Sequence, residues 1–222
     1  MDRVLGDKKA IAVFILPGFI IFLGIIIVPI VLSSYYSTLE WDGIGKSTFI
    51  GLDNYYKLLV DNSDGFGQSI INSVLLAVLS VVIQLPIALI LALIVASGIK
   101  GENFFRSAYF IPVIVSTVVI GQMWMKIYNP QYGLLNQLLR SIGLDSWAKP
   151  WIGSTDTALM AVFVPLIWQY IGYHMLLMYA SIKSIPQDIT EAAKIDGASN
   201  IRTAISITIP LIKPMIEVCV IF

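Results

Sequence analysis

The chain offers few side chains that could carry out chemistry. It contains one cysteine, Cys219, and one histidine, His174, so several His or Cys ligands cannot gather around a metal, and a Ser/His/Asp triad could form only around His174. The segment Gly45-Lys46-Ser47 matches the end of a phosphate-binding loop, but the first glycine of that motif would fall at Glu40. We therefore expect no catalytic residue, no metal ligand and no cofactor held by this chain.

The most organised polar stretch lies at residues 184–210. Two overlapping capping-box patterns, Ser184-x-x-Gln187 and Asp188-x-x-Glu191, predict that a helix starts here with its first amide groups bonded by those side chains. Small residues on one face, and a glycine suited to a left-handed helix end, would let another surface approach closely: Ala192, Ala193 and Gly197. The plain alternative is an amphipathic turn that rests on the membrane interface.

A second polar run interrupts an otherwise apolar segment, and its members are Trp168, Gln169, Tyr170, Tyr173 and His174. Aromatic faces beside amide and hydroxyl groups suit a neutral sugar, because rings cover the C–H surface while the polar groups bond its hydroxyls. At helical spacing Trp168 and Tyr170 point to different faces, so the five cannot all line one path. The alternative is an aromatic belt or simple hydrogen bonding between helices.

The composition indicates a membrane protein that crosses the bilayer several times. Hydrophobic residues make up 57% of the chain and charged residues 13%, against about 25% charged in an ordinary soluble domain. The mean hydropathy is +0.83. The 14 basic and 14 acidic residues balance, and no basic tract points to nucleic acid as a partner.

Apolar runs of about 20 residues, the length that crosses the hydrocarbon core, predict an all-α helix bundle. We place four spans and the start of a fifth, which the chain end cuts short, at 10–32, 69–97, 107–128, 157–180 and 211–222. Prolines inside these runs predict kinks, which neighbouring helices can tolerate in a bundle. We treat 1–222 as a single transmembrane domain.

Basic residues in the short connections set the expected orientation. Lys and Arg cluster in the N-terminal tail, in the turn after the second span and in the 184–210 loop, whereas the opposite loops carry more acid. Because cytoplasmic loops hold the excess of Lys and Arg, these three segments and the N-terminus are expected in the cytoplasm.

The 184–210 loop resembles the cytoplasmic signature loop of the membrane subunits of ATP-binding-cassette (ABC) importers. The matching features are Glu191-Ala192-Ala193, Gly197 four residues further on, and Ile207-Thr208-Ile209-Pro210, where Ile209 stands in place of the usual Leu. Further segments are similar to permeases of the sugar-uptake branch, first-subunit type: Phe49 to Tyr55, Phe105-Arg106, Phe110-Ile111-Pro112, Gly133-Leu134-Leu135-Asn136 and Ile195 to Ser199. Such permeases carry about six spans, so about five are expected here.

This resemblance implies a function and a set of partners. The chain would be a permease subunit in a bacterial plasma membrane that imports a sugar or oligosaccharide with a second permease, two ATPase subunits that bind ATP and magnesium, and an extracytoplasmic sugar-binding protein. By resemblance, the loop residues that contact the ATPase are Glu191, Ala192, Ala193, Asp196, Gly197, Ile207 and Pro210. In such permeases the part of the fourth span that holds Trp168 to His174 faces the sugar.

Two other functions remain open from the sequence. An ion-coupled transporter would need ionisable groups at mid-membrane depth, and the complete spans hold none beyond His174. A membrane scaffold without transport activity fits the hydrophobicity but leaves the 184–210 loop unexplained.

Overall fold

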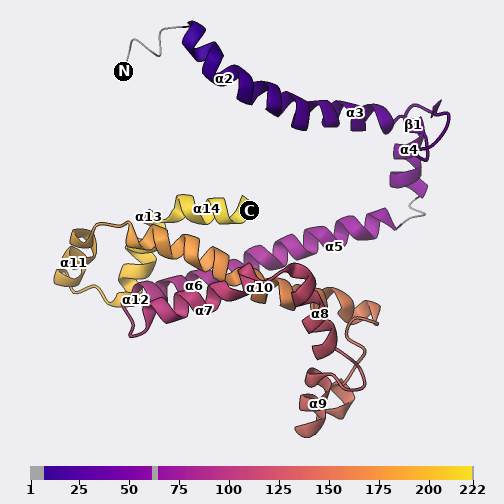
Figure 1. Cartoon of the computed structure of the whole chain (residues 1–222). Helices are drawn as coiled ribbons and strands as arrows, with labels where there is room; N and C mark the ends of the chain where they lie inside the picture. Colours follow the sequence, from indigo (N-terminus) through magenta and orange to yellow (C-terminus); the bar gives the residue numbers. More distant parts are fainter. Residues whose placement is uncertain (1–7, 62–64, 222) are drawn as a thin grey trace. The chain divides into compact units, whose positions relative to one another are not determined.

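A computed structural model describes residues 8–61 and 65–221, and nearly all of its regular structure is helical (Figure 1). The chain divides into two compact units, residues 1–71 and 72–222. Three helices in the described residues are long and apolar enough to cross a membrane, and up to five if each of two bent helix pairs is one span. The expected all-α class is confirmed.

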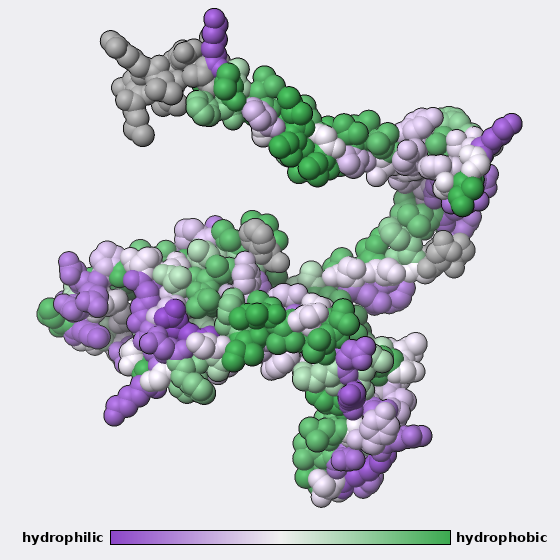
Figure 2. Space-filling model, in the orientation of Figure 1, coloured by the Kyte–Doolittle hydropathy of each residue, from purple (hydrophilic) through white to green (hydrophobic). Residues whose placement is uncertain are grey.

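The first unit begins with one long helical rod made of α2 (Lys8–Phe22), η1 (Leu23–Ile27) and α3 (Val28–Tyr36). Its apolar part, Ile11–Tyr36, covers nearly all of the span expected at 10–32. Figure 2 shows apolar side chains along this rod, as expected of a helix that faces lipid on most sides.

A short β-hairpin and two short helical segments follow the rod, and their contacts account for the Phe49 to Tyr55 motif. The strands β1 (Leu39–Glu40) and β2 (Thr48–Phe49) pair antiparallel before α4 (Asp53–Tyr56) and η2 (Lys57–Asp61). The Asn54 side-chain amide donates to the carbonyl oxygens of Ser37 at 3.0 Å and Leu39 at 2.9 Å. The motif therefore ties the hairpin to the end of the first span.

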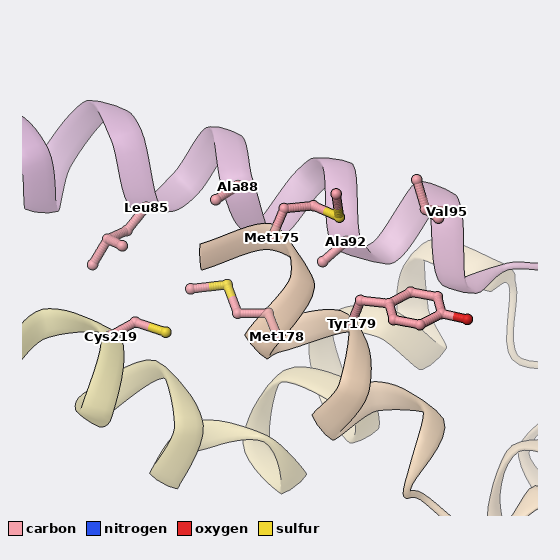
Figure 3. Close-up of a cluster of buried hydrophobic side chains, with 8 residues drawn as sticks. All are labelled: Leu85, Ala88, Ala92, Val95, Met175, Met178, Tyr179 and Cys219. Carbon is pink, nitrogen blue, oxygen red and sulfur yellow. The ribbon is translucent and has the colours of Figure 1, made fainter. Parts of the chain in front are cut away.

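The second unit packs around α10 (Thr155–Lys183). Its neighbours are α6 (Leu85–Ala96), which continues α5 (Phe66–Leu79) and η3 (Ser80–Gln84), and α7 (Glu102–Ile114). Figure 3 shows the buried cluster formed by α6, α10 and α14 (Lys213–Ile221): Leu85, Ala88, Ala92, Val95, Met175, Met178, Tyr179 and Cys219. Ala88 and Ala92 are fully buried one turn apart, because small residues let helix backbones approach closely in a membrane.

Three prolines share one structural solution. The π-helical turns η1, η3 and η5 (Ala204–Thr208) each end two residues before a proline, namely Pro29, Pro86 and Pro210. A proline donates no backbone hydrogen bond and its ring clashes with the carbonyl four residues earlier. In each case the amide just before the proline donates to the carbonyl five residues back, as Val28 does to Leu23, so the helix continues without a break.

The expected third span, 107–128, is not one helix. It consists of α7 and α8 (Thr117–Ile127), which meet at an angle of 94°. Val115 and Ser116 between them have extended backbone, with ψ of 137° and 133°. Hydropathy measures how apolar a run is, and it does not report whether the backbone stays helical, so the sequence could not locate this break.

The start of the fifth span also differs from the expected residue 211. A helix already runs from α12 (Asn200–Thr203) through η5 and α13 (Ile209–Leu211), and it meets α14 at 65°. The expectation placed the start at the first strongly apolar residues, whereas Ser199 caps this helix earlier by accepting a hydrogen bond from the Arg202 amide at 3.3 Å.

The segment between α8 and α10 folds around one asparagine. It contains α9 (Leu134–Ser141) and the short helix η4 (Asp145–Trp147). Asn136 is 1% exposed; its amide donates to the carbonyls of Pro130 and Lys149, and its oxygen accepts from the Trp151 indole at 2.7 Å. The Gly133 to Asn136 motif therefore holds this connection together.

A very close helix contact in the second unit lies at Gly172 of α10. A Cβ atom at this position would overlap the Tyr109 carbonyl oxygen of α7. Only glycine permits this approach, and the contact sets the distance between α7 and α10.

We predict that Gly172→Ala destabilises the protein, because the added methyl group would force α7 away from α10. Overpacking of this kind costs roughly 1 to 3 kcal/mol, so the unfolding temperature in detergent should fall. Gly121→Ala is the matched control, since a Cβ atom at this α8 position meets no atom within 4 Å. Equal unfolding temperatures for the two variants would contradict the close approach.

Candidate functional site

The loop expected to couple to another subunit is built around α11 (Gln187–Ile195). This helix begins directly after Pro186, the N-cap residue, whose backbone is extended with φ of −55° and ψ of 135°. Among the described residues, no side chain caps the helix. The predicted capping boxes are therefore wrong. Ser184 has helical backbone where it ends α10, and its hydroxyl donates to the Ser181 carbonyl at 2.7 Å instead of receiving an amide of α11.

The other end of α11 closes as expected at Gly197. Its φ of +79° lies in the left-handed region that favours glycine. The Gly197 amide donates to the Lys194 carbonyl at 3.0 Å and the Ala198 amide donates to the Ala193 carbonyl at 2.9 Å. This is a Schellman motif, which satisfies carbonyl groups that the helix end would otherwise leave unbonded.

The surface of α11 combines charge with exposed apolar residues. Glu191, Ala192 and Asp196 are exposed, and Ile195 is 86% exposed. Figure 2 shows polar residues gathered around this helix. Ala193 is only 6% exposed and packs within the chain, so the face available to a partner holds Ala192 and Gly197 but not Ala193.

The exit of the loop is helical. Ile207 is partly buried and Thr208 is 7% exposed within η5, and the exposed Pro210 stands near the start of α13. The helix is continuous from Asn200 to Leu211, so the loop leads into the fifth span through helical backbone.

The polar run of α10 spreads over several faces. Gln169 is 3% exposed, and its amide lies 3.5 Å from the Thr117 hydroxyl at the start of α8. The His174 side chain is 8% exposed and its Nδ1 has no hydrogen-bond partner among the described residues. Tyr170 and Tyr173 are more than one-third exposed. The structure therefore does not gather the run into one site.

Trp168 points to a separate, apolar environment. Its ring lies edge-on to Trp124 of α8, with 6.1 Å between ring centroids. It also lines an apolar groove of about 610 Å³ between α6, α7 and α10 whose other members include Phe104, Tyr109 and Ile171. This groove offers few polar groups for sugar hydroxyls. The role of Trp168, Gln169, Tyr170, Tyr173 and His174 as a substrate path stays a prediction.

A polar cluster that the sequence did not predict lies where α7 begins and α10 ends. Glu102, in the first turn of α7, accepts a hydrogen bond from the Tyr179 hydroxyl and pairs with Lys183 in the last turn of α10. An acid at one helix start and a base at a helix end are signals that could have suggested the pair. Their proximity depends on the packing of α7 against α10.

Comparisons with known proteins agree with this architecture. Residues 66–218 match the family described as binding-protein-dependent transport system inner membrane component. A probable ABC transporter permease of Bacillus subtilis is 38% identical over 98% of this chain and 75% of the relative. A diacetylchitobiose uptake permease of Streptomyces coelicolor is 32% identical over 91% of this chain and 60% of the relative.

Solved structures show the same fold. A bacterial ABC transporter that imports the acidic polysaccharide alginate has a TM-score of 0.81 at 25% identity, covering 99% of this chain and 74% of that chain. An alginate transporter in complex with a periplasmic protein that holds an alginate pentasaccharide has a TM-score of 0.80 at 24% identity, covering 96% of this chain and 70% of that chain. The family match covers most of the sequence, and the similarity to the Bacillus subtilis relative extends over nearly the whole of this chain. The chain therefore belongs to the family of binding-protein-dependent transport system inner membrane components.

Proposed function

We propose that this chain is a permease subunit that imports a sugar or oligosaccharide across the membrane, driven by ATP hydrolysed on other subunits. The observation that carries the proposal is α11, a helix closed by a Schellman motif on the loop after the fourth span, which presents Glu191, Ala192 and Ile195 to the outside. A polar helix with exposed apolar residues fits docking onto another protein better than isolation in water.

The substrate class rests on the relatives. Permeases for diacetylchitobiose in Streptomyces coelicolor and for trehalose and maltose in Thermococcus litoralis are 32% and 34% identical to this chain. All of these substrates are rich in hydroxyl groups. The chain spans 60% of the first relative's length and 72% of the second's.

The partners follow from the same reasoning. A second permease would complete the path, and two ATPase subunits carrying ATP and magnesium would receive the α11 loops. An extracytoplasmic binding protein would deliver the sugar, as the periplasmic protein of the solved alginate transporter complex suggests.

Within this chain, the contact between Gln169 and Thr117 lies next to the α7–α8 bend. A polar group at a bend is well placed to respond when helices move.

The first prediction concerns the end of α11. Gly197→Val should reduce copurification of the ATPase subunit, because a β-branched residue at a φ of +79° disrupts the helix end and the docking surface with it. The measurement is a pull-down of the ATPase from detergent-solubilised membranes.

Gly197→Asn is the matched control for this prediction, since asparagine tolerates the left-handed conformation better than other residues. It should retain most of the ATPase. Full pull-down and normal uptake by the valine variant would show that α11 is not the docking helix.

The second prediction concerns the energy source. Proteoliposomes that contain the complete transporter should import sugar when ATP is present on the cytoplasmic side, and uptake should survive an uncoupler that collapses the proton gradient. Uptake driven by an imposed proton gradient without ATP would instead identify an ion-coupled transporter, with His174 as its first candidate proton carrier.

The third prediction concerns the polar run of α10. Gln169→Ala should reduce uptake several-fold, because a buried hydrogen-bonding side chain next to the α7–α8 bend is lost. Gln122→Ala, the same change at an exposed position of α8, should leave uptake unchanged. ATPase copurification should be normal in both variants, and wild-type uptake by the Gln169 variant would remove this residue from the path.

A further inference from the structure

The polar cluster between α7 and α10 joins two helices through several independent contacts. Glu102 accepts the Tyr179 hydroxyl on one carboxylate oxygen, and the Lys183 ammonium group lies 3.4 Å from both of its oxygens. The negative charge sits at the start of α7 and the positive charge at the end of α10, so each also interacts favourably with the dipole of its own helix. The two helix ends are thereby held side by side.

Tyr179 connects this cluster to the buried core. Tyr179 is 8% exposed and belongs to the apolar cluster formed with Val95 and Met175 (Figure 3). Its hydroxyl group donates a hydrogen bond to the Glu102 carboxylate. The guanidinium carbon of Arg106 lies 4.7 Å from the centre of the ring, in the range of a cation–π interaction. Packing and charge therefore fix the same side chain.

Helix α7 contacts α10 through a polar cluster and a close backbone approach, whereas α8 contacts α10 through a hydrogen bond between side chains. In α7, Glu102 and Tyr109 both meet α10, through the polar cluster and through the close approach at Gly172. In α8, beyond the 94° bend, Thr117 meets α10 through its 3.5 Å hydrogen bond with Gln169. The extended residues between the two helices can then act as a pivot.

The coupling loop lies directly beyond the cluster. Lys183 ends α10 and Gln187 begins α11, so three residues separate the cluster from the proposed docking helix. A displacement of α11 acts first on the last turn of α10, where Tyr179 and Lys183 hold Glu102.

We propose that Glu102, Arg106, Tyr179 and Lys183 form a helix-end latch that makes α7 follow α11, so that movement of the docking helix bends the chain at Val115 and Ser116. These are positioning residues, because they act through α7. The inference rests on the proposed function of the loop. It adds a route by which that loop reaches the α7–α8 bend, in addition to the fifth span.

A distance measurement tests the latch directly. Spin labels at Phe104→Cys on α7 and Gln187→Cys on α11 report the distance between the two helices by pulsed electron paramagnetic resonance. Both positions are exposed. Cys219→Ala removes the one native cysteine of this sequence. In the complete transporter the distance should be the same without nucleotide and with ATP trapped, whereas with Tyr179→Phe it should change between these states or broaden.

Tyr179→Phe keeps the ring in the core and removes only the hydroxyl group, so folding should be preserved. The proposal would be overturned if the distance changed between the two nucleotide states in the protein with an intact latch. It would also be overturned if Tyr179→Phe gave the same unchanged and narrow distance as the intact latch. If the transporter shows no ATP-driven sugar uptake, the proposed function has failed. In that case the distance distribution is measured on this chain without its partners. A broader distribution for Tyr179→Phe than for the unsubstituted protein would still show that Tyr179 holds α7 to α11.

A double-mutant cycle provides the functional readout. Glu102→Gln and Lys183→Gln each remove the ion pair between the two helix ends, so each should lower the amount of sugar imported per ATP hydrolysed several-fold, while ATPase copurification stays normal. The double variant should be no worse than either single one, because both remove the same interaction. Additive losses would overturn the latch.

Glu217→Gln serves as the matched control for charge removal. Glu217 pairs with Lys213 at 3.7 Å, one turn away on the surface of α14, and both side chains are well exposed. Exposed pairs of this kind contribute little, so sugar imported per ATP should be unchanged. A loss as large as that of Glu102→Gln would mean that any charge change in this part of the protein impairs transport, and the latch would be rejected.

Discussion

The close approach of α10 to α6 and α7 is the contact on which the second unit depends. In lipid, apolar side chains gain little by leaving the surrounding hydrocarbon, so helices associate where their backbones can come near enough to pack. Ala88 and Ala92 permit this on the α6 side, and Gly172 permits it on the α7 side. Every element proposed to carry function is attached to this three-helix core.

The requirement that backbone groups stay bonded inside a membrane explains how the helices bend. At Pro29, Pro86 and Pro210 a π-helical turn compensates for the hydrogen-bond donor that proline lacks, and each helix continues without a break. The break between α7 and α8 is of another kind, since two residues leave the helical conformation altogether. The protein thus combines prolines that the helices accommodate with a true break in the helix at Val115 and Ser116.

The 184–210 loop is formed by local rules and positioned by packing. Pro186 and Gly197 set the two ends of α11 through their own backbone preferences. Its orientation depends on Ala193, which packs inward and turns Glu191, Ala192 and Ile195 outward. The Glu102–Lys183 pair lies at the end of α10 from which this loop departs, so the loop and the polar cluster are neighbours along the chain.

The sequence by itself determined the membrane setting, the approximate places of the candidate spans, the family resemblance and the left-handed end of α11. Each of these depends on a local property, such as the length of an apolar run or the lack of a Cβ atom in Gly197. The tertiary structure decided the rest. Ser184 cannot cap α11 because it is still helical at the end of α10. Helical spacing already separated Trp168 from Tyr170, but only packing placed Gln169 against Thr117 and Trp168 in an apolar groove. Glu102 and Lys183 are far apart in the sequence, and only the packing of α7 against α10 brings their charges together.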